Sequence, residues 1–263
     1  PARHGFAPCR KQAPGPGKNV MKIDTREIAE IAAAQPVVPR VDLYAGIHKA
    51  LRAFMTDTLL GLGRMDVEDD LDFAQGCQRV AQLLDVLQAH LEHENRFVHP
   101  AIEARAQGGS LAVADEHEGH ERAILRLVRA VADLMACARA DRAPRAQALY
   151  HALALFVAHN FEHMHLEETA HNAALWQHYT DDELMAVHGA LVSSIPPGEM
   201  MLVMRWMVPF MAPAERVALL GEMRQQAPAD AFGAVLDVVR PHLTAREWDK
   251  LMAGLGMAAA AAR

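Results

Sequence analysis

Apolar residues recur at three- and four-residue intervals through four long stretches of this chain, and no other feature constrains its fold as strongly. The stretches span residues 41–62, 71–105, 115–138 and 144–178, with Asp115 and Pro144 as starting signals. Short connections between them favour antiparallel neighbours. Aromatic residues make up only 5% of the chain, which disfavours strands. The pattern therefore predicts an all-α fold with an up-down-up-down four-helix bundle over residues 41–179.

The sequence after the fourth stretch predicts shorter helices. Thr180 with Glu183 and Thr244 with Glu247 each have the spacing of a capping box, which marks a helix start. Prolines interrupt the remaining sequence repeatedly. We expect residues 180–263 to form a C-terminal extension of about five short helices.

Methionines gather within this extension, around Trp206. They are Met200, Met201, Met204, Met207 and Met211. Methionine is a flexible filler of protein cores, and the spacing mostly follows one helical face. An exposed methionine surface would instead bind a protein partner or a second copy of the chain. Core packing is the favoured interpretation, and the interaction surface stays open as the alternative.

The first residues have a different character from the rest. Residues 1–40 open with "PARHGFAPCRKQAPGPGKNV", which is rich in proline, glycine and basic residues and has no apolar periodicity. This opening lacks the apolar run of a signal peptide. We expect residues 1–40 to be a disordered leader and N-terminal segment outside the fold.

Charge and cysteine content narrow the classes of function. The net charge of −7 gives no electrostatic support to nucleic-acid binding. No apolar run approaches the roughly 20 residues of a membrane-spanning helix, so no membrane contact is expected. The three cysteines, Cys9, Cys77 and Cys137, form no Cys-x-x-Cys motif and cannot all pair with one another. These features favour a protein of the reducing cytoplasm.

Two of the long helices place a histidine and a glutamate one turn apart within the apolar stripe. The pairs are His90 with Glu94 and His163 with Glu167, whereas His99 is expected to point away. A buried carboxylate without a partner is costly. Two such pairs therefore predict a compensating group, and a metal cluster supplies it directly.

The first and third helices add one histidine each to this interior. His48 shares a face with the apolar residues of the first helix. The face expected on the third helix comprises His117, Ile124, Val128, Val131 and Met135. The predicted metal ligands are thus His48, His90, Glu94, His117, His163 and Glu167.

The chemistry of this ligand set indicates the metal. Imidazole and carboxylate without thiolate suit iron or manganese, and suit zinc less specifically. Six ligands exceed the needs of one tetrahedral zinc but fit two six-coordinate ions, each with two histidines and both glutamates as bridges. With a bridging oxygen, about one position on each ion stays open for a small ligand.

With these ligands the sequence resembles the hemerythrin-like family, also called the HHE cation-binding domain. The matching stretches, one on each bundle helix, are "GIHKALR", "HLEHENRFVHPAIEAR", "DEHEGH" and "EHMHLEET". The resemblance covers residues 41–179 and implies a non-heme di-iron centre with an oxo or hydroxo bridge. It favours two iron ions over manganese or zinc.

The sequence departs from the oxygen-carrying members of that family in one position. Those proteins have a fifth histidine one turn after the third-helix ligand, and here that position is Glu121. His120 and His159 are candidates for a fifth ligand or for supporting the ligands from behind. Tyr44, one turn before His48, is a candidate to gate or tune the site, or an ordinary core residue.

The resemblance therefore implies sensing or repair more than simple oxygen carriage. We expect a protein that binds or senses a small ligand such as dioxygen, nitric oxide or iron. The same site would also suit a di-iron enzyme that acts on nitric oxide or peroxide, or that donates iron for iron-centre repair. A metal-free interaction module is a third hypothesis, which the buried carboxylates Glu94 and Glu167 oppose.

Two other metal motifs fit the sequence less well. His159, Glu162 and His163 spell the H-x-x-E-H motif of inverted zincin peptidases. Glu162 falls outside the apolar stripe, however, and the strands of such a peptidase are not predicted. A ferritin-like site needs two Glu-x-x-His motifs, and the bundle helices offer only the one from Glu168 to His171.

Overall fold

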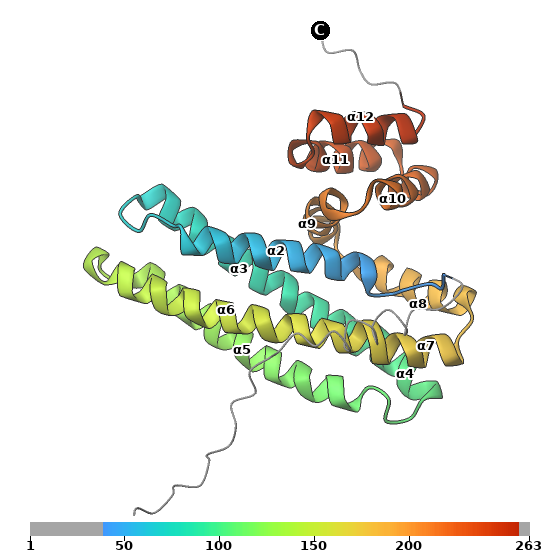
Figure 1. Ribbon diagram of the computed structural model, residues 1–263, viewed down its shortest axis with the longest axis horizontal. Coiled ribbons are helices and arrows are strands. Elements are labelled where there is room, and N and C mark those ends of the chain that lie inside the picture. The colour runs from blue at the N-terminus through green and yellow to red at the C-terminus, as the bar shows by residue number, and fades with distance from the viewer. Residues whose placement is uncertain (1–38, 258–263) are drawn as a thin grey trace, which may run out of the picture. The chain divides into compact units, whose positions relative to one another are not determined.

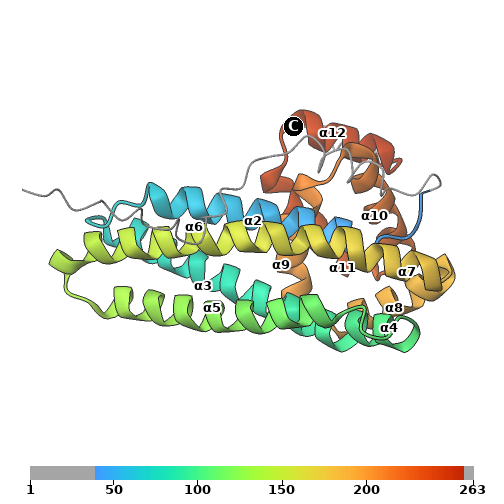
Figure 2. The same cartoon turned by 60° about the horizontal axis from the view of Figure 1, so that its bottom comes forward.

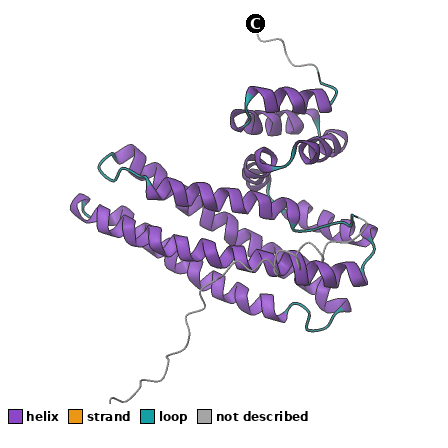
Figure 3. Ribbon diagram, viewed as in Figure 1, coloured by secondary structure: helices purple, strands orange, loops and turns teal. Residues whose placement is uncertain are grey.

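The computed structural model describes residues 39–257, and within this range the chain is helical and contains no strand (Figure 3). The all-α fold is thereby confirmed. The predicted leader lies outside the described residues except for positions 39 and 40. No helix in the described range combines the length and apolar character needed to cross a membrane.

Four long helical segments form a bundle. They are α2 (Ala45–Gly63); α3 (Asp70–His93), which continues through the π-helical turn η1 (Glu94–Val98) into α4 (His99–Arg105); α5 (Leu111–Ala136); and α6 (Arg142–Leu166), which continues through the π-helical turn η3 (Glu167–His171) into α7 (Asn172–His178). The short 3-10 helix η2 (Arg139–Asp141) joins α5 to α6. Both α2 and α5 pack against α3 and α6, so the segments surround a common interior (Figure 1, Figure 2).

The third segment begins earlier than its sequence predicts, at Leu111 instead of after Asp115. A tight turn before α5 explains the difference. The Glu103 carboxylate accepts hydrogen bonds from the backbone N–H groups of Gly108 (2.8 Å) and Ser110 (3.0 Å). Gly108 has a φ of +80°, a conformation that glycine adopts without strain. The turn therefore closes at Ser110, and the helix starts directly after it.

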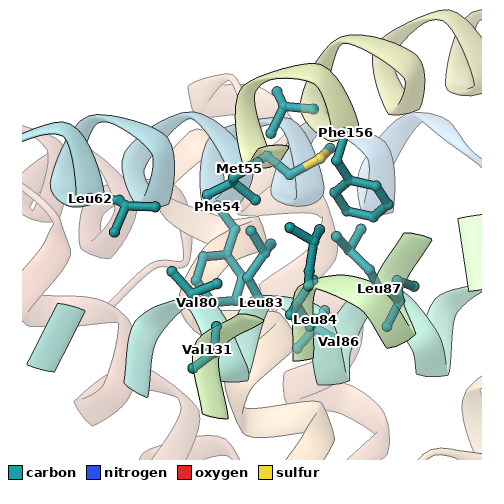
Figure 4. Close-up of a cluster of buried hydrophobic side chains, with 14 of the residues drawn as sticks. Phe54, Met55, Leu62, Val80, Leu83, Leu84, Val86, Leu87, Val131 and Phe156 are labelled. Carbon is teal, nitrogen blue, oxygen red and sulfur yellow. The ribbon is translucent and has the colours of Figure 1, made fainter. Parts of the chain in front are cut away.

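Aliphatic and aromatic side chains fill most of the bundle interior (Figure 4). Leu83 and Leu84 of α3 and Met55 of α2 are fully buried there, beside Phe54 and Phe156. The face predicted for α5 is partly wrong. Val128 and Met135 are 44% and 58% exposed, and their neighbours Leu127 and Leu134 are buried instead. At 3.6 residues per turn, positions 127 and 128 both border the stripe, and packing against α3 and α6 decides between them.

A smaller apolar cluster closes one end of the bundle, where α4 and α7 lie together with α8 (Asp181–Ser194) (Figure 1, Figure 2). Its buried members are Tyr44, Val98, Ile102, Leu175 and Leu184. Arg105 of α4 also pairs with Glu183 of α8 (2.5 Å). The interior between this cluster and the main core holds the polar side chains described below.

The helices after the bundle have an apolar core of their own. Leu184 of α8 belongs to the cluster at the end of the bundle. The separate core is formed by α9 (Pro197–Met207), η4 (Val208–Phe210), α10 (Pro213–Gln226), α11 (Ala229–Val239) and α12 (Ala245–Gly254), with η5 (Arg240–His242) between the last two. Both predicted capping boxes, at Thr180 and Thr244, are present. In the methionine-rich segment, Met204 is buried in this core, and Met200, Met201 and Met207 pack against it.

Candidate metal centre

The six predicted ligands lie together in the bundle interior, although the chain separates them widely. His48 comes from α2 and His117 from α5, while the two longer segments each contribute a histidine and a glutamate. Five of the six residues are at most 2% exposed. His90 is the least buried, with 10% of its side chain exposed. The grouping of these residues from four helical segments was therefore predictable from their spacing in the sequence.

The first group of ligand atoms belongs to His48, His90, Glu94 and Glu167, and these atoms lie within 4.8 Å of one another. Glu94 Oε1 is 3.2 Å from His90 Nε2 and 3.8 Å from His48 Nε2. Glu167 Oε2 is 3.4 Å from His48 Nε2. One oxygen of each carboxylate therefore faces this histidine pair.

The second group contains His117 and His163 with the same two glutamates. Glu94 Oε2 is 3.5 Å from His117 Nε2. Glu167 Oε1 is 3.4 Å from Nε2 of both histidines. Each carboxylate thus turns one oxygen toward each histidine pair, so the same two glutamates could bridge cations held at the two positions.

The hydrogen bonding of the site fits cations at these positions. Nε2 of His48 and His90 and all four carboxylate oxygens of Glu94 and Glu167 are buried without a hydrogen-bond partner. Buried polar groups are nearly always hydrogen bonded, so such a concentration of unpaired atoms indicates ligands for metal ions. The Nε2 atoms of His117 and His163 are 3.0 Å apart. That separation suits neighbouring ligands about 2.1 Å from one six-coordinate ion.

Three of the histidines form a hydrogen bond to a polar side chain through Nδ1, the ring nitrogen that does not face the ligand groups. The His48 Nδ1–H group donates to Glu168 (3.0 Å), that of His117 to Asn95 (2.8 Å) and that of His163 to Glu116 (2.8 Å). Such bonds fix the ring orientation and leave the Nε2 lone pair free for a metal. Arg52 in turn holds the Glu168 carboxylate with two hydrogen bonds, of 2.5 and 2.9 Å.

The two buried glutamates differ in their electrostatic surroundings. Burial, together with the neighbouring Glu167 carboxylate, raises the pKa of Glu94 well above its usual range. Burial would also raise the pKa of Glu167, but the imidazoles of His117 and His163 outweigh it and hold this pKa below its usual range. Protonation is therefore easier at Glu94 than at Glu167 when no cation is bound.

A π-helical turn begins at each of the two glutamates. In η1 the backbone N–H of His99 donates to the carbonyl of Glu94, five residues back. In η3 the N–H of Asn172 donates to the carbonyl of Glu167 in the same way. Such turns insert one extra residue into a helix and often occur at functional sites. Here they change which side chains face the interior after each glutamate.

This change of register corrects the prediction for His99. It was expected to point away, but it is 7% exposed and lies beside Glu167 and His171. His171 is fully buried, and its Nδ1 is 2.9 Å from the Tyr44 hydroxyl. Burial lowers the pKa of both histidines to about 4, which leaves them neutral at neutral pH. A repeated signal was available in the sequence, since each ligand glutamate is followed by a histidine four or five residues later.

The three additional candidates from the sequence have different surroundings. His120 is 7% exposed and packs against the ring of His163 (4.6 Å between centroids), outside the ligand groups. His159 is exposed, so its placement on the inner stripe is wrong, and the buried residue there is its neighbour Asn160. Tyr44 is 1% exposed, and its ring lies 5.2 Å from that of His48. Burial, reinforced by the two glutamates, raises its pKa well above the usual value.

Glu168 also differs from its prediction. Its position outside the stripe suggested an outward side chain, but the carboxylate turns back to His48 and Arg52. Burial raises the pKa of Glu168, yet the hydrogen bonds from these two residues outweigh it and lower the pKa to about 2. Glu162, by contrast, is exposed as predicted, which removes the general base that a zincin site would need.

A helical bundle with paired histidines and two shared carboxylates in its interior defines a class of proteins that bind metal cations between helices. The family model of the hemerythrin HHE cation-binding domain matches residues 40–173, just over half of the chain. The chain belongs to this family. No curated protein and no solved structure gave a significant match.

Proposed function

We propose that this chain holds a non-heme di-iron centre that binds or senses a small ligand, with dioxygen, nitric oxide or iron itself as the candidates. One observation carries the proposal: Glu94 and Glu167 each direct one oxygen toward each histidine pair. Iron suits this mixture of imidazole and carboxylate ligands, with manganese and zinc as the alternatives.

The chain's own residues would hold and enclose the centre. His48 and His90 would bind one iron, His117 and His163 the other, and both carboxylates would bridge them. When bound, two such ions supply redox-active metal with coordination positions open to a small molecule. The apolar clusters on either side exclude water from the site. This enclosure favours a small ligand over a larger substrate.

The C-terminal helices contact the helix that carries His48, which supports a reporting role for them. The Trp206 ring of α9 stacks on Phe54 of α2 with centroids 4.2 Å apart. Lys49, next to His48, pairs with Glu215 of α10 (2.6 Å). A change at the metal site that shifts α2 would therefore reach α9 and α10, and through them a protein partner or a second copy of the chain.

Anaerobic reconstitution tests this function. The protein would receive two equivalents of ferrous iron, and its optical spectrum would be followed while dioxygen or nitric oxide is added. We expect both equivalents to bind and the spectrum to change in proportion to the added gas. Glu94→Ala, which removes one bridging carboxylate, is expected to lose iron and the optical response together.

The same experiment separates ligand binding from catalysis. A stoichiometric response that reverses when the gas is removed supports binding or sensing. Repeated turnover of nitric oxide or peroxide would instead favour the di-iron enzyme. A protein that retains no iron, or whose spectrum ignores both gases, would contradict the proposal.

A further inference from the structure

A second polar cluster adjoins the two ligand groups and contains none of their histidines. His99, His171 and Glu167 each place one ligand atom within 4.8 Å of the others. The Nε2 atoms of both histidines are buried and have no hydrogen-bond partner. Two imidazoles and one carboxylate form the ligand set of mononuclear non-heme iron(II) sites, which keep open positions on the metal.

The backbone places these two histidines in the interior. In a regular α-helix, a residue five positions after Glu94 would be rotated about 140° away from it. The π-helical turn reduces that rotation, because the N–H of His99 bonds to the carbonyl of Glu94 five residues back. His171 ends the π-helical turn that begins at Glu167, and its four-residue spacing already keeps it near the face of Glu167. Both helices therefore direct a further histidine toward the shared carboxylate.

Tyr44 orients one of these rings. The His171 Nδ1 atom is 2.9 Å from the Tyr44 hydroxyl oxygen, and both side chains are buried. When Nδ1–H donates to this oxygen, the Nε2 lone pair faces the cluster. The pattern matches that of His48, His117 and His163, whose Nδ1 atoms also bond to a polar side chain. A histidine held this way is prepared for metal binding at its other nitrogen.

We propose that His99, His171 and Glu167 form a third metal-binding position, which takes a divalent first-row ion such as ferrous iron. This position is the weakest of the three for two reasons. Glu167 already faces His48, His117 and His163, and neighbouring cations repel one another. The inference goes beyond the proposed di-iron function, because it concerns an additional ion and requires no reaction with a gas.

The test is a metal count on the full chain in excess ferrous iron under anaerobic equilibrium dialysis. We expect the wild-type protein to bind three equivalents, the third more weakly than the first two. His99→Ala and His171→Ala are each expected to bind two equivalents. His165→Ala is the matched control, because His165 is a half-buried histidine of α6 outside every ligand group and its loss is expected to leave three.

Tyr44→Phe provides a milder variant that keeps all the ligands and nearly the same shape. Loss of the bond to His171 is expected to weaken the third equivalent by about 10- to 100-fold, as loss of a supporting hydrogen bond commonly does. The first two equivalents should keep their affinity. Circular dichroism melting of each variant verifies that the bundle is folded before iron is counted.

Several results would overturn the third position. They are saturation of the wild-type protein at two equivalents, retention of the third by either histidine variant, and its loss in His165→Ala. Failure of the di-iron proposal has a different signature, because it would affect the first two equivalents or their response to dioxygen and nitric oxide. Those measurements stay intact if only the third position is absent.

Discussion

The bundle interior has two regions that are equally buried but chemically opposite. One is filled by hydrocarbon side chains such as Leu83, Leu84 and Met55, whose burial is itself stabilising by about 25 cal/mol per Å². The other is filled by imidazoles and carboxylates, whose burial is costly unless they find partners. The same four helical segments supply both regions.

The contrast indicates that the polar region needs partners that neighbouring side chains do not supply. Among the residues that the structure describes, most buried side-chain atoms without a hydrogen-bond partner belong to His48, His90, Glu94, His99, Glu167 and His171. All six residues belong to the three groups of ligand atoms. Metal binding would therefore contribute directly to the stability of this region, as it does in other sites that have no alternative partners for their ligands. The apolar region needs no such contribution.

Glu167→Ala is the strongest test of this contrast. Glu167 belongs to all three groups of ligand atoms, so its removal is expected to reduce iron binding below detection. Iron at a thousandfold excess over its Kd stabilises a protein that binds it by about 4 kcal/mol, and the variant should lose this entire gain. Iron content and thermal unfolding with and without iron measure both effects.

Glu162→Ala is the control for this variant, because Glu162 lies on the same helical segment with an exposed side chain. It should bind iron and gain stability from it as the wild-type protein does. Full iron content in Glu167→Ala would disprove its role as the shared ligand.

Leu83→Ala tests the other region. Leu83 is fully buried in the main core, and its truncation is expected to lower the free energy of unfolding by about 2–5 kcal/mol. The loss should be the same with and without iron, and the iron count should not change. Denaturant unfolding measures it, with Leu71→Ala as the control on α3, since Leu71 is 67% exposed. A loss that disappears when iron is added would mean that the two regions are not separable.

The sequence predicted the fold, and it placed the central residues of the candidate site on inner helical faces, because both follow from regular helical geometry. Apolar spacing located the four long segments, and the His-x-x-x-Glu pairs placed His90 with Glu94 and His163 with Glu167 on inner faces. These predictions need only 3.6 residues per turn, and the structure keeps that geometry up to each glutamate.

The predictions failed where the geometry is irregular or where side chains cross between helices. His99 was assigned outward because no periodicity rule anticipates a π-helical turn after Glu94. His159 was assigned inward because positions 159 and 160 both border the stripe, and packing selects Asn160. Glu168 reaches His48 on another helix, a contact that depends on the length and rotamer of the side chain and not on its spacing along the chain.

Glu116→Ala is expected to have the smallest effect of the three, and it asks how far the polar region extends beyond its ligands. Glu116 accepts the Nδ1–H hydrogen bond of His163 (2.8 Å), and its side chain is 40% exposed. Loss of this support is expected to weaken iron binding about 10-fold, near the lower end for supporting residues because solvent can replace the carboxylate.

Glu118→Ala is the control on α5, since Glu118 contacts only the exposed Arg122 among the pairs observed and should leave iron affinity unchanged. Competition against a chromophoric chelator measures the affinities. Equal affinities in the two variants would limit the polar region to the metal ligands themselves, whereas a selective loss in Glu116→Ala would extend it to the residues that orient them.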